Sequence, residues 1–373
     1  MRYHNDLRSR PLAGPSVEAV KSALTFEAGT RPTVASQDLL AASFPRHRGW
    51  RTIVVVMAAS ASLLAACSSS RTRPPTVQQG VAYIADSGSY IITPISLKTR
   101  RALPPIPAGS SPSALAASKD GRTLYAVNYS SSSLAIIDPA HPVNPPPHVA
   151  TGASPIRVAI SPNGKTAYVV DAAANAVTPV DLTTHTAGFP IIVGQHPTSI
   201  AINSSGTRAY VTDFASGQVT PIDLGTGKAT TPISAGNQPV AIALSGNGDT
   251  AYVADYAIGK VAVVDTKTGQ VTGSIKVGSE PSSITLSASG KRAYVTNYSS
   301  GTVSVISLAS RRVVRTLRVG SEPADIALSP DGTIAYVVVY SSNSVVPIEL
   351  SSLSVGKPIP AGPGASGIVV VKK

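Results

Sequence analysis

Two glutamates and one histidine occupy equivalent places in the chain, and their side chains are well suited to binding a ligand. Glu280, Glu322 and His196 each stand directly before a proline, and Glu322 follows Glu280 by 42 residues. Carboxylates with an imidazole could hold a divalent cation, and oxygen ligands favour Ca²⁺ or Mg²⁺. Uncharged polar residues stand at two further equivalent places, Ser154 and Gln238. Because the set is mixed, we interpret it as a surface for a partner and expect no metal centre. If a metal does bind, the three ionisable side chains are its candidate ligands.

A second column of acids accompanies the first. Asp171, Asp213 and Asp255 each follow a tyrosine by three residues. An aspartate that recurs at the end of strands usually caps a loop by accepting hydrogen bonds from backbone amides. If the loops that carry both columns open on one face, they form one candidate binding surface. Its residues are Ser154, His196, Gln238, Glu280, Glu322, Asp171, Asp213 and Asp255.

Motifs that carry catalysis or hold a cofactor are missing from the sequence. It contains no nucleophile elbow, zinc-binding pattern or phosphate-binding glycine loop. Segment 225–228 (GTGK) comes nearest to a phosphate loop, but alanine follows the lysine where Ser or Thr is required. His141, His148 and His185 have no acid at a spacing that indicates a catalytic pair. We predict no catalytic residue and no cofactor.

The single cysteine lies in a pattern typical of exported proteins. Arg46, Arg48 and Arg51 precede an uncharged run over 52–66, and Cys67 follows directly. This order of basic, apolar and small residues defines a secretory signal. The run is shorter than the roughly 20 residues of a membrane span. Its last residues with the cysteine (LAAC) resemble the bacterial lipobox, which implies that Cys67 is lipidated and that two acyl chains anchor the protein stably.

These patterns divide the chain into four parts. We interpret residues 1–45 as a disordered extension or a misassigned start, 46–66 as a lipoprotein signal peptide, 67–80 as a flexible tether and 81–373 as the folded domain. Without the first 66 residues, 23 Lys and Arg remain against 15 Asp and Glu, which leaves a net charge of +8. We expect an exported monomer, anchored to a bacterial membrane and facing the periplasm or the cell exterior.

A repeat of about 42 residues organises the folded domain. Within the unit 280–320, four segments rich in β-formers indicate short strands, at 283–287, 292–296, 302–307 and 313–319. Four antiparallel strands in this length are typical of one β-propeller blade. A tyrosine recurs once in every unit, at Tyr83, Tyr125, Tyr168, Tyr210, Tyr252, Tyr294 and Tyr336. The sequence therefore predicts an all-β, seven-bladed propeller, with the tyrosines packed between neighbouring blades.

The end of the chain is needed to close this ring. Only the tether precedes Tyr83, so the first blade lacks the inner strand that precedes every other tyrosine of the repeat. Ile368 lies 42 residues after Ile326 and therefore in the register of an inner strand. We predict that the C-terminal strand completes the first blade, so that no long strand edge stays open inside the ring.

Short motifs link the repeats to a known family. They are the segments 294–297 (YVTN), 210–213 (YVTD), 252–255 (YVAD) and 168–171 (YVVD), and the turns 329–332 (SPDG) and 161–164 (SPNG). In these motifs the chain resembles the YVTN-repeat β-propellers of bacterial cell-surface and periplasmic proteins, the YncE-like group, over about residues 81–373. The resemblance implies the propeller fold and leaves the activity open.

The positive charge indicates a further kind of partner. Four arginines gather in and before one outer strand: Arg311, Arg312, Arg315 and Arg318. Such cations attract nucleic acid or anionic polymers, but we interpret them first as solvated charge on the rim. Arg157 and Asp325 share one inner-strand position in different blades. We expect this pair to be ordinary solvated groups near the channel.

The function predicted from these features is a non-catalytic binding or scaffolding module on a lipid-anchored envelope protein. Its partner would be a protein or an envelope polymer. One alternative is a propeller enzyme of the lactonase or lyase type, with a divalent metal at the channel mouth. A second alternative is an electrostatic binder of nucleic acid or anionic polymer, although nucleic acid is not the partner that we expect.

Overall fold

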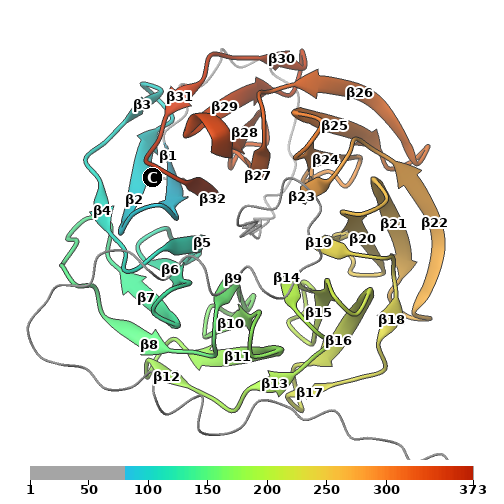
Figure 1. Ribbon diagram of the computed structural model, residues 1–373, viewed down its shortest axis with the longest axis horizontal. Helices are drawn as coiled ribbons and strands as arrows, with labels where there is room; N and C mark the ends of the chain where they lie inside the picture. The colour runs from blue at the N-terminus through green and yellow to red at the C-terminus, as the bar shows by residue number, and fades with distance from the viewer. Residues whose placement is uncertain (1–79, 373) are drawn as a thin grey trace, which may run out of the picture. The chain divides into compact units, whose positions relative to one another are not determined.

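The computed structural model describes residues 80–372, which form seven antiparallel β-sheets arranged as blades around a central axis (Figure 1). The fold class predicted from the repeat, an all-β propeller with four strands per blade, is confirmed. The predicted extension, signal peptide and Cys67 lie outside the described residues. Within the described part, the helical element is η1 (Tyr340–Ser342), and no helix there is long and apolar enough to cross a membrane.

Each blade has an inner, a second, a third and an outer strand. Blade 1 contains β32 (Ala365–Lys372), β1 (Gly80–Asp86), β2 (Ile91–Ser96), β3 (Arg101–Ala102) and β4 (Ile106–Pro107). Blade 2 contains β5 (Pro112–Ala117), β6 (Leu124–Asn128), β7 (Ser133–Ile137) and β8 (His148–Ala150). Blade 3 contains β9 (Pro155–Ile160), β10 (Thr166–Asp171), β11 (Ala176–Asp181), β12 (Thr186–Ala187) and β13 (Ile191–Ile192).

The remaining blades follow the same order. Blade 4 contains β14 (Pro197–Ile202), β15 (Arg208–Asp213), β16 (Gln218–Asp223), β17 (Lys228–Ala229) and β18 (Ile233–Ser234). Blade 5 contains β19 (Pro239–Leu244), β20 (Thr250–Asp255), β21 (Lys260–Asp265) and β22 (Gln270–Lys276). Blade 6 contains β23 (Pro281–Leu286), β24 (Arg292–Asn297), β25 (Thr302–Ser307) and β26 (Arg312–Arg318). Blade 7 contains β27 (Pro323–Leu328), β28 (Ile334–Val339), β29 (Ser344–Glu349), β30 (Ser354–Val355) and β31 (Ile359–Pro360).

The ring closes by mixing the two ends of the described chain. The last strand, β32, pairs antiparallel with β1, and Ile368 lies opposite Ile84. The strand therefore occupies the inner position of blade 1, between the inner strands of blades 7 and 2 (Figure 1). The predicted closure is confirmed. It satisfies the backbone edge of β1 that would otherwise stay unpaired.

Prolines explain why several outer strands are split into two short segments. The third strand has a central proline in blades 1, 3, 4 and 7, at Pro94, Pro179, Pro221 and Pro347. Because proline has no N–H to give to the ladder, the outer strand pairs only on either side of it. Blades 5 and 6 have Val263 and Val305 at this place, and their outer strands run unbroken over seven residues.

The hydrophobic core lies between neighbouring blades. The repeated tyrosines are buried there; Tyr336, for example, packs with Ile84 and Ile95 of blade 1, and Tyr83 packs with Leu115 of blade 2. The predicted packing role of the tyrosine column is confirmed for these blades. Every blade is complete within residues 80–372, and the core clusters consist of these residues. This part of the chain therefore has the core it needs to fold on its own.

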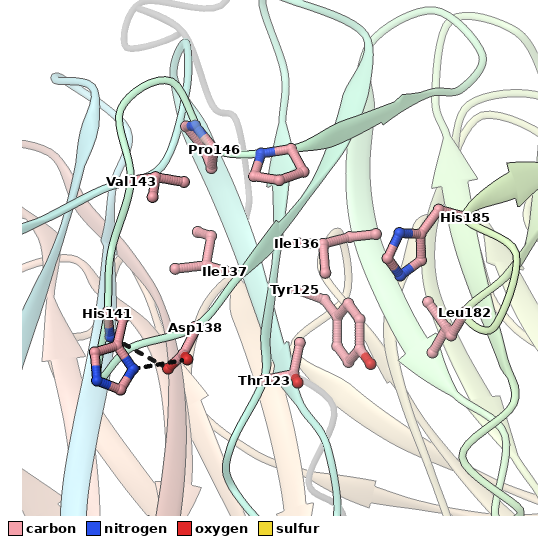
Figure 2. Close-up of a pocket in the computed structure, with 11 residues that line it drawn as sticks. Thr123, Tyr125, Ile136, Ile137, Asp138, His141, Val143, Pro146, Leu182 and His185 are labelled. Carbon is pink, nitrogen blue, oxygen red and sulfur yellow. Dashed lines mark hydrogen bonds and ion pairs between the residues drawn. The ribbon is translucent and has the colours of Figure 1, made fainter.

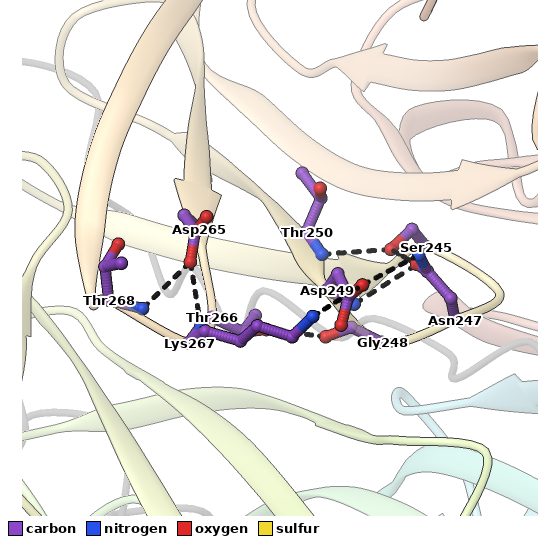
Figure 3. Close-up of polar contacts among 9 residues, drawn as sticks. All are labelled: Ser245, Asn247, Gly248, Asp249, Thr250, Asp265, Thr266, Lys267 and Thr268. Carbon is purple, nitrogen blue, oxygen red and sulfur yellow. Dashed lines mark hydrogen bonds and ion pairs between the residues drawn. The ribbon is translucent and has the colours of Figure 1, made fainter.

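The ring has two different faces. Turns from first to second strand and from third to fourth strand share one face, as in blade 5, where Lys267 Nζ lies 3.1 Å from Asp249 Oδ2 (Figure 3). Gly80 belongs to this face, because its carbonyl accepts a hydrogen bond from the N–H of Leu97 in the turn after β2. We call it the Gly80 face. We call the opposite face, formed by the loops after each second and each outer strand, the mouth.

Candidate functional site

One repeated main-chain hydrogen bond joins the two sets of loops that form the mouth. The residue that follows the second strand of a blade donates its N–H to a carbonyl in the same blade. This carbonyl belongs to the residue that precedes the inner strand. The donor and acceptor pairs, 2.8–3.1 Å apart, are Tyr129 and Ser111, Ala172 and Ser154, Phe214 and His196, Tyr256 and Gln238, Tyr298 and Glu280, and Tyr340 and Glu322. The two predicted columns therefore lie in adjacent loops on the same face.

The aspartate column lies below this surface. Asp171, Asp213 and Asp255 are 0, 0 and 1% exposed. Asp171 and Asp213 each accept a hydrogen bond of 2.5 Å from the threonine seven residues later. Asp255 accepts one of 2.6 Å from the N–H of Asn237 in the neighbouring loop. These three members of the predicted binding surface cannot contact a partner, and they hold the mouth loops in place instead.

The same carboxyls have unusual acidities. Burial raises the pKa of Asp86, Asp171 and Asp213 to about 6, and hydrogen bonds from a threonine hydroxyl and a glycine N–H oppose the rise. The fit is close: a Cβ on Gly152 would lie 2.7 Å from Cγ of Asp171. Loop closure at the mouth is therefore coupled to a carboxyl group that takes up a proton at mildly acidic pH.

The residues directly before the proline column reach the surface of the mouth. Most adopt a left-handed backbone with φ between 52° and 58°, which costs a non-glycine residue about 1–2 kcal/mol; they are Ser111, Ser154, His196, Glu280 and Glu322. Because the bend recurs with different side chains, it belongs to the fold and not to one ligand. These residues and Gln238 are half-buried. The bend presents Ser, His or Glu side chains at the same point of different blades.

Aromatic residues extend this surface across blades 4 to 7. The ring of Phe214 meets the rings of His196 and Tyr256 edge-on, with centroids 6.0 and 6.2 Å away. Burial and then a hydrogen bond to a glutamate raise the pKa of Tyr256, whose partner is Glu280. In the next blade, burial and then the negative charge of Glu322 raise the pKa of Tyr298, and a hydrogen bond to Glu322 adds to the rise. We call this set the mouth arc: His196, Phe214, Tyr256, Glu280, Tyr298, Glu322 and Tyr340.

The aromatic members occupy one position of the repeat. Each directly follows the Asp/Asn column, where the repeat holds Ser87, Tyr129 and Ala172 in the first three blades. The available signal was therefore the unbroken run of aromatic residues at this position in blades 4 to 7, with Tyr129 as a further one in blade 2. Tyr256 is buried, Phe214 and Tyr298 are half-buried, and Tyr340 is exposed.

The three metal candidates do not form a ligand set. Among residues 80–372, no group of three or more His, Cys, Asp or Glu side chains is placed to hold a metal ion. Glu280 and Glu322 lie beside tyrosine hydroxyls, and His196 lies against Phe214. The arc can offer hydrogen bonds, negative charge and aromatic edges to a partner.

The expectation that Arg157 and Asp325 are solvated is wrong. They are 3 and 0% exposed and belong to the inner strands β9 and β27. Asp325 accepts hydrogen bonds from Ser283 Oγ and from the N–H groups of Ile326 and Ile368, at 2.9, 2.9 and 3.1 Å. Nε and Nη1 of Arg157 have no hydrogen-bond partner within the described residues. Burial lowers the pKa of Arg157 and raises that of Asp325, and the opposite charge of each opposes the shift of the other.

A separate groove of about 330 Å³ lies between blades 2 and 3, away from the mouth (Figure 2). It is lined mainly by apolar side chains such as Ile136, Val143 and Leu182. At one end His141 Nδ1 lies 3.2 Å from Asp138 Oδ2 (Figure 2). The prediction that His141 has no paired acid is therefore wrong. Both side chains are largely exposed, so this pair is a surface contact.

The predicted arginine cluster lies on the rim. Arg312, Arg315 and Arg318 are exposed on β26, the outer strand of blade 6. Arg311 Nη1 donates to the carbonyl of Thr272 at 3.3 Å and so links blade 6 to blade 5. The cluster is spread along one strand. Within residues 80–372 it lines neither of the two grooves found, so it forms no basic groove with aromatic side chains beside it.

Comparison with known proteins agrees with this architecture. A family model described as YNCE-like β-propeller matches residues 146–333. The chain belongs to this family. The resemblance that the YVTN motifs indicated is therefore confirmed. None of the curated proteins compared with this YNCE-like propeller matches it.

Several solved structures are similar to this YNCE-like propeller. Hydrazine synthase of Kuenenia stuttgartiensis is 21% identical, with a TM-score of 0.61 over 70% of this chain and 95% of that chain. A protein of unknown function from Desulfotomaculum acetoxidans is 17% identical, with a TM-score of 0.68 over 78% and 99%. A candidate 6-phosphogluconolactonase from Bacteroides fragilis is 18% identical, with a TM-score of 0.65 over 80% and 100%. At these identities the likeness shows the fold alone.

Proposed function

We propose that this YNCE-like propeller is the binding module of an exported, lipid-anchored envelope protein, and that the mouth arc contacts its partner. The partner is a protein or an envelope polymer. Anchoring places the propeller outside the cytoplasmic membrane, with Cys67 as the acylated residue. The role is non-catalytic: the propeller holds its partner and presents it near the membrane.

One observation supports the mouth as the binding surface. The loops share one main-chain hydrogen bond in every blade that carries the proline column, while the residue before the proline is Ser in blades 2 and 3, His in blade 4, Gln in blade 5 and Glu in blades 6 and 7. Across blades 4 to 7 they form a continuous series of aromatic and carboxylate groups. A uniform framework with individual side chains is how one fold usually carries a particular specificity. Tyrosines with a polar tip are also favoured at interfaces.

The anchor is tested by replacing the acceptor of the lipid. We expect Cys67→Ser to abolish acylation, which is measured by the incorporation of labelled fatty acid. We also expect the variant to be lost from the lipoprotein fraction that detergent extracts. The control is Ser352→Ala, a substitution at an exposed serine of the propeller, which we expect to leave labelling unchanged. Equal labelling of the Cys67→Ser variant would contradict the proposal.

A second function is supported by the structural likeness to the candidate lactonase from Bacteroides fragilis. In this alternative the mouth acids and His196 act on a small substrate, with a divalent cation supplied to the site. The geometry favours it less, because the described residues do not assemble a metal ligand set.

Metal dependence separates the two functions. For a binding module, we expect a chelator to leave the melting temperature unchanged, and Glu280→Gln and Glu322→Gln to respond to the chelator as the wild type does. If a chelator lowers the melting temperature and either substitution removes that effect, the metal-dependent enzyme is the correct function.

A further inference from the structure

The chain reaches the propeller at a particular place on the Gly80 face. Gly80 pairs with Lys372 of the last strand, and its carbonyl accepts the N–H of Leu97. The neighbouring turn of blade 2 touches the same strand, since a Cβ on Gly121 would lie 3.4 Å from the carbonyl oxygen of Lys372. The turn after β2, the turn after β5 and the end of β32 therefore surround the point at which the preceding residues join the ring.

These elements carry a cluster of exposed cations. We call it the Gly80 cluster, and it consists of Lys98, Arg100, Arg101, Lys119, Arg122 and Lys372. Arg100 is paired with Glu349 at 2.7 Å, and Arg122 lies 3.8 Å from Asp120. Lys98, Arg101, Lys119 and Lys372 make no ion pair within the described part of the chain. Most of the positive charge here is therefore uncompensated.

The mouth has a different charge. Its loops carry Glu280 and Glu322, which have no ion pair among residues 80–372. Three cations lie at strand ends on that side: Lys260 lies opposite Lys276 in blade 5, and Arg318 ends β26. The exposed charges of the mouth nearly cancel, whereas four cations of the Gly80 cluster have no ion pair among the described residues.

We propose that the Gly80 cluster docks on the anionic headgroups of the lipid bilayer to which the protein is anchored. The inference rests on the proposed lipid anchor, because the 13 residues from Cys67 to position 79 span at most about 45 Å when fully extended. A basic cluster held this close to an anionic surface is attracted to it within about a Debye length. Docking through this face turns the mouth away from the membrane and toward a partner.

Docking of the Gly80 cluster would also add to the free energy of membrane binding. A protein anchored by acyl chains alone is free to rotate about its tether, whereas acyl chains combined with a basic patch form the usual two-signal anchor. Nucleic acid would also be attracted to such a patch through its phosphates. The position of the tether favours lipid as the occupant.

The test uses the chain from Ser68 onward, which keeps the tether and the complete ring but has no acylated cysteine. Binding is measured by co-sedimentation with vesicles of phosphatidylglycerol and phosphatidylcholine and with vesicles of phosphatidylcholine alone. We compare the triple variant Lys98→Gln, Arg101→Gln, Lys119→Gln with the matched triple variant Lys260→Gln, Lys276→Gln, Arg318→Gln. Both variants lose the same charge, but only the first loses it from the Gly80 cluster.

We expect binding to the anionic vesicles only, weakened by salt. Each cation near such a surface contributes about a fivefold factor, so the first triple variant should bind at least about tenfold more weakly, and the matched variant within about twofold of the wild type. Equal losses in both variants, or equal binding to neutral vesicles, would overturn the proposal. Binding to a single-stranded oligonucleotide without binding to anionic vesicles would assign the face to nucleic acid and would also overturn it. None of these results depends on acylation, so a failed Cys67 experiment is distinguishable from a failed docking experiment.

Discussion

The buried aspartates below the mouth couple the shape of the binding surface to pH. In the folded protein the pKa of Asp86, Asp171 and Asp213 is raised from 3.8 to about 6. Between these two values the folded protein binds more protons than the unfolded chain. Their contribution to stability therefore increases as the pH falls through 6 toward 4, which is opposite to the usual salt-bridged carboxylate.

Substitution by asparagine isolates this effect. Asparagine cannot ionise, and the repeat already tolerates it in the same column at Asn128 and Asn297. We expect the double variant Asp171→Asn, Asp213→Asn to gain less stability than the wild type between about pH 7.5 and about pH 5, by about 1.5 kcal/mol per carboxyl.

The measurement is the free energy of unfolding in urea at both pH values. Burial lowers the pKa of His196, so its contribution to the stability of the protein decreases as the pH falls. His196 is present in both proteins, and its contribution therefore cancels in the comparison. The same pH dependence in the variant and in the wild type would show that these carboxyls do not titrate as the structure indicates.

At the scale of single elements, β32 closes the ring and is buried on both of its faces. Ile368, Val369 and Val371 of β32 are buried in the clusters on either side of blade 1. Deleting residues 362–373 removes these side chains and leaves the edge of β1 unpaired. We expect the melting temperature to fall by more than about 10 °C.

Point variants separate this effect from simple truncation. Ile368→Ala should lower the free energy of unfolding by about 2–5 kcal/mol, because its side chain is fully buried. Lys372→Ala, at an exposed position of the same strand, should stay within about 0.5 kcal/mol of the wild type. Thermal and urea unfolding measure both variants. A truncated protein that melts like the full chain would refute closure by this strand.

The outer strands illustrate a local rule that overrides the repeat. Unit 280–320 has no proline in its third strand, and it gives one continuous outer strand, β26. In blade 4, Pro221 removes one ladder hydrogen bond, and the outer strand is split into β17 and β18. The repeat length predicted the number of blades, whereas the proline pattern decided how regular each blade edge is.

At the scale of the whole molecule, the opposite charges of Arg157 and Asp325 are buried in the inner strands of blades 3 and 7, which are far apart in the sequence, and each charge affects the pKa of the other. Removing one charge leaves the other buried without its opposite charge, which typically costs about 3–5 kcal/mol. We expect Asp325→Asn and Arg157→Met each to destabilise the protein by about this amount.

The double variant is the decisive comparison. Arg157→Met with Asp325→Asn should cost less than the sum of the single changes, because neither unpaired charge remains. Urea unfolding of all four proteins gives the coupling energy. Additive losses would show that the two groups do not sense each other across the channel.

The sequence alone determined the architecture, because a propeller is built from one local unit whose length, tyrosine and turns recur and can be counted. It also placed the two columns of loop residues on one face, since a strand order that repeats puts equivalent loops at the same end. Even the closure by Ile368 followed from register. These are periodic properties, and periodicity is visible in a single chain.

The tertiary structure alone decided which of those residues are accessible. Asp171 and Arg157 read as ordinary polar residues, yet both are buried, because loops and strands distant in the sequence cover them. The mouth arc likewise depends on how neighbouring blades bring Phe214, Tyr256 and Tyr298 together. Burial and pairing between blades are set by contacts that no repeat length encodes, so the sequence predicted the framework and the fold determined its chemistry.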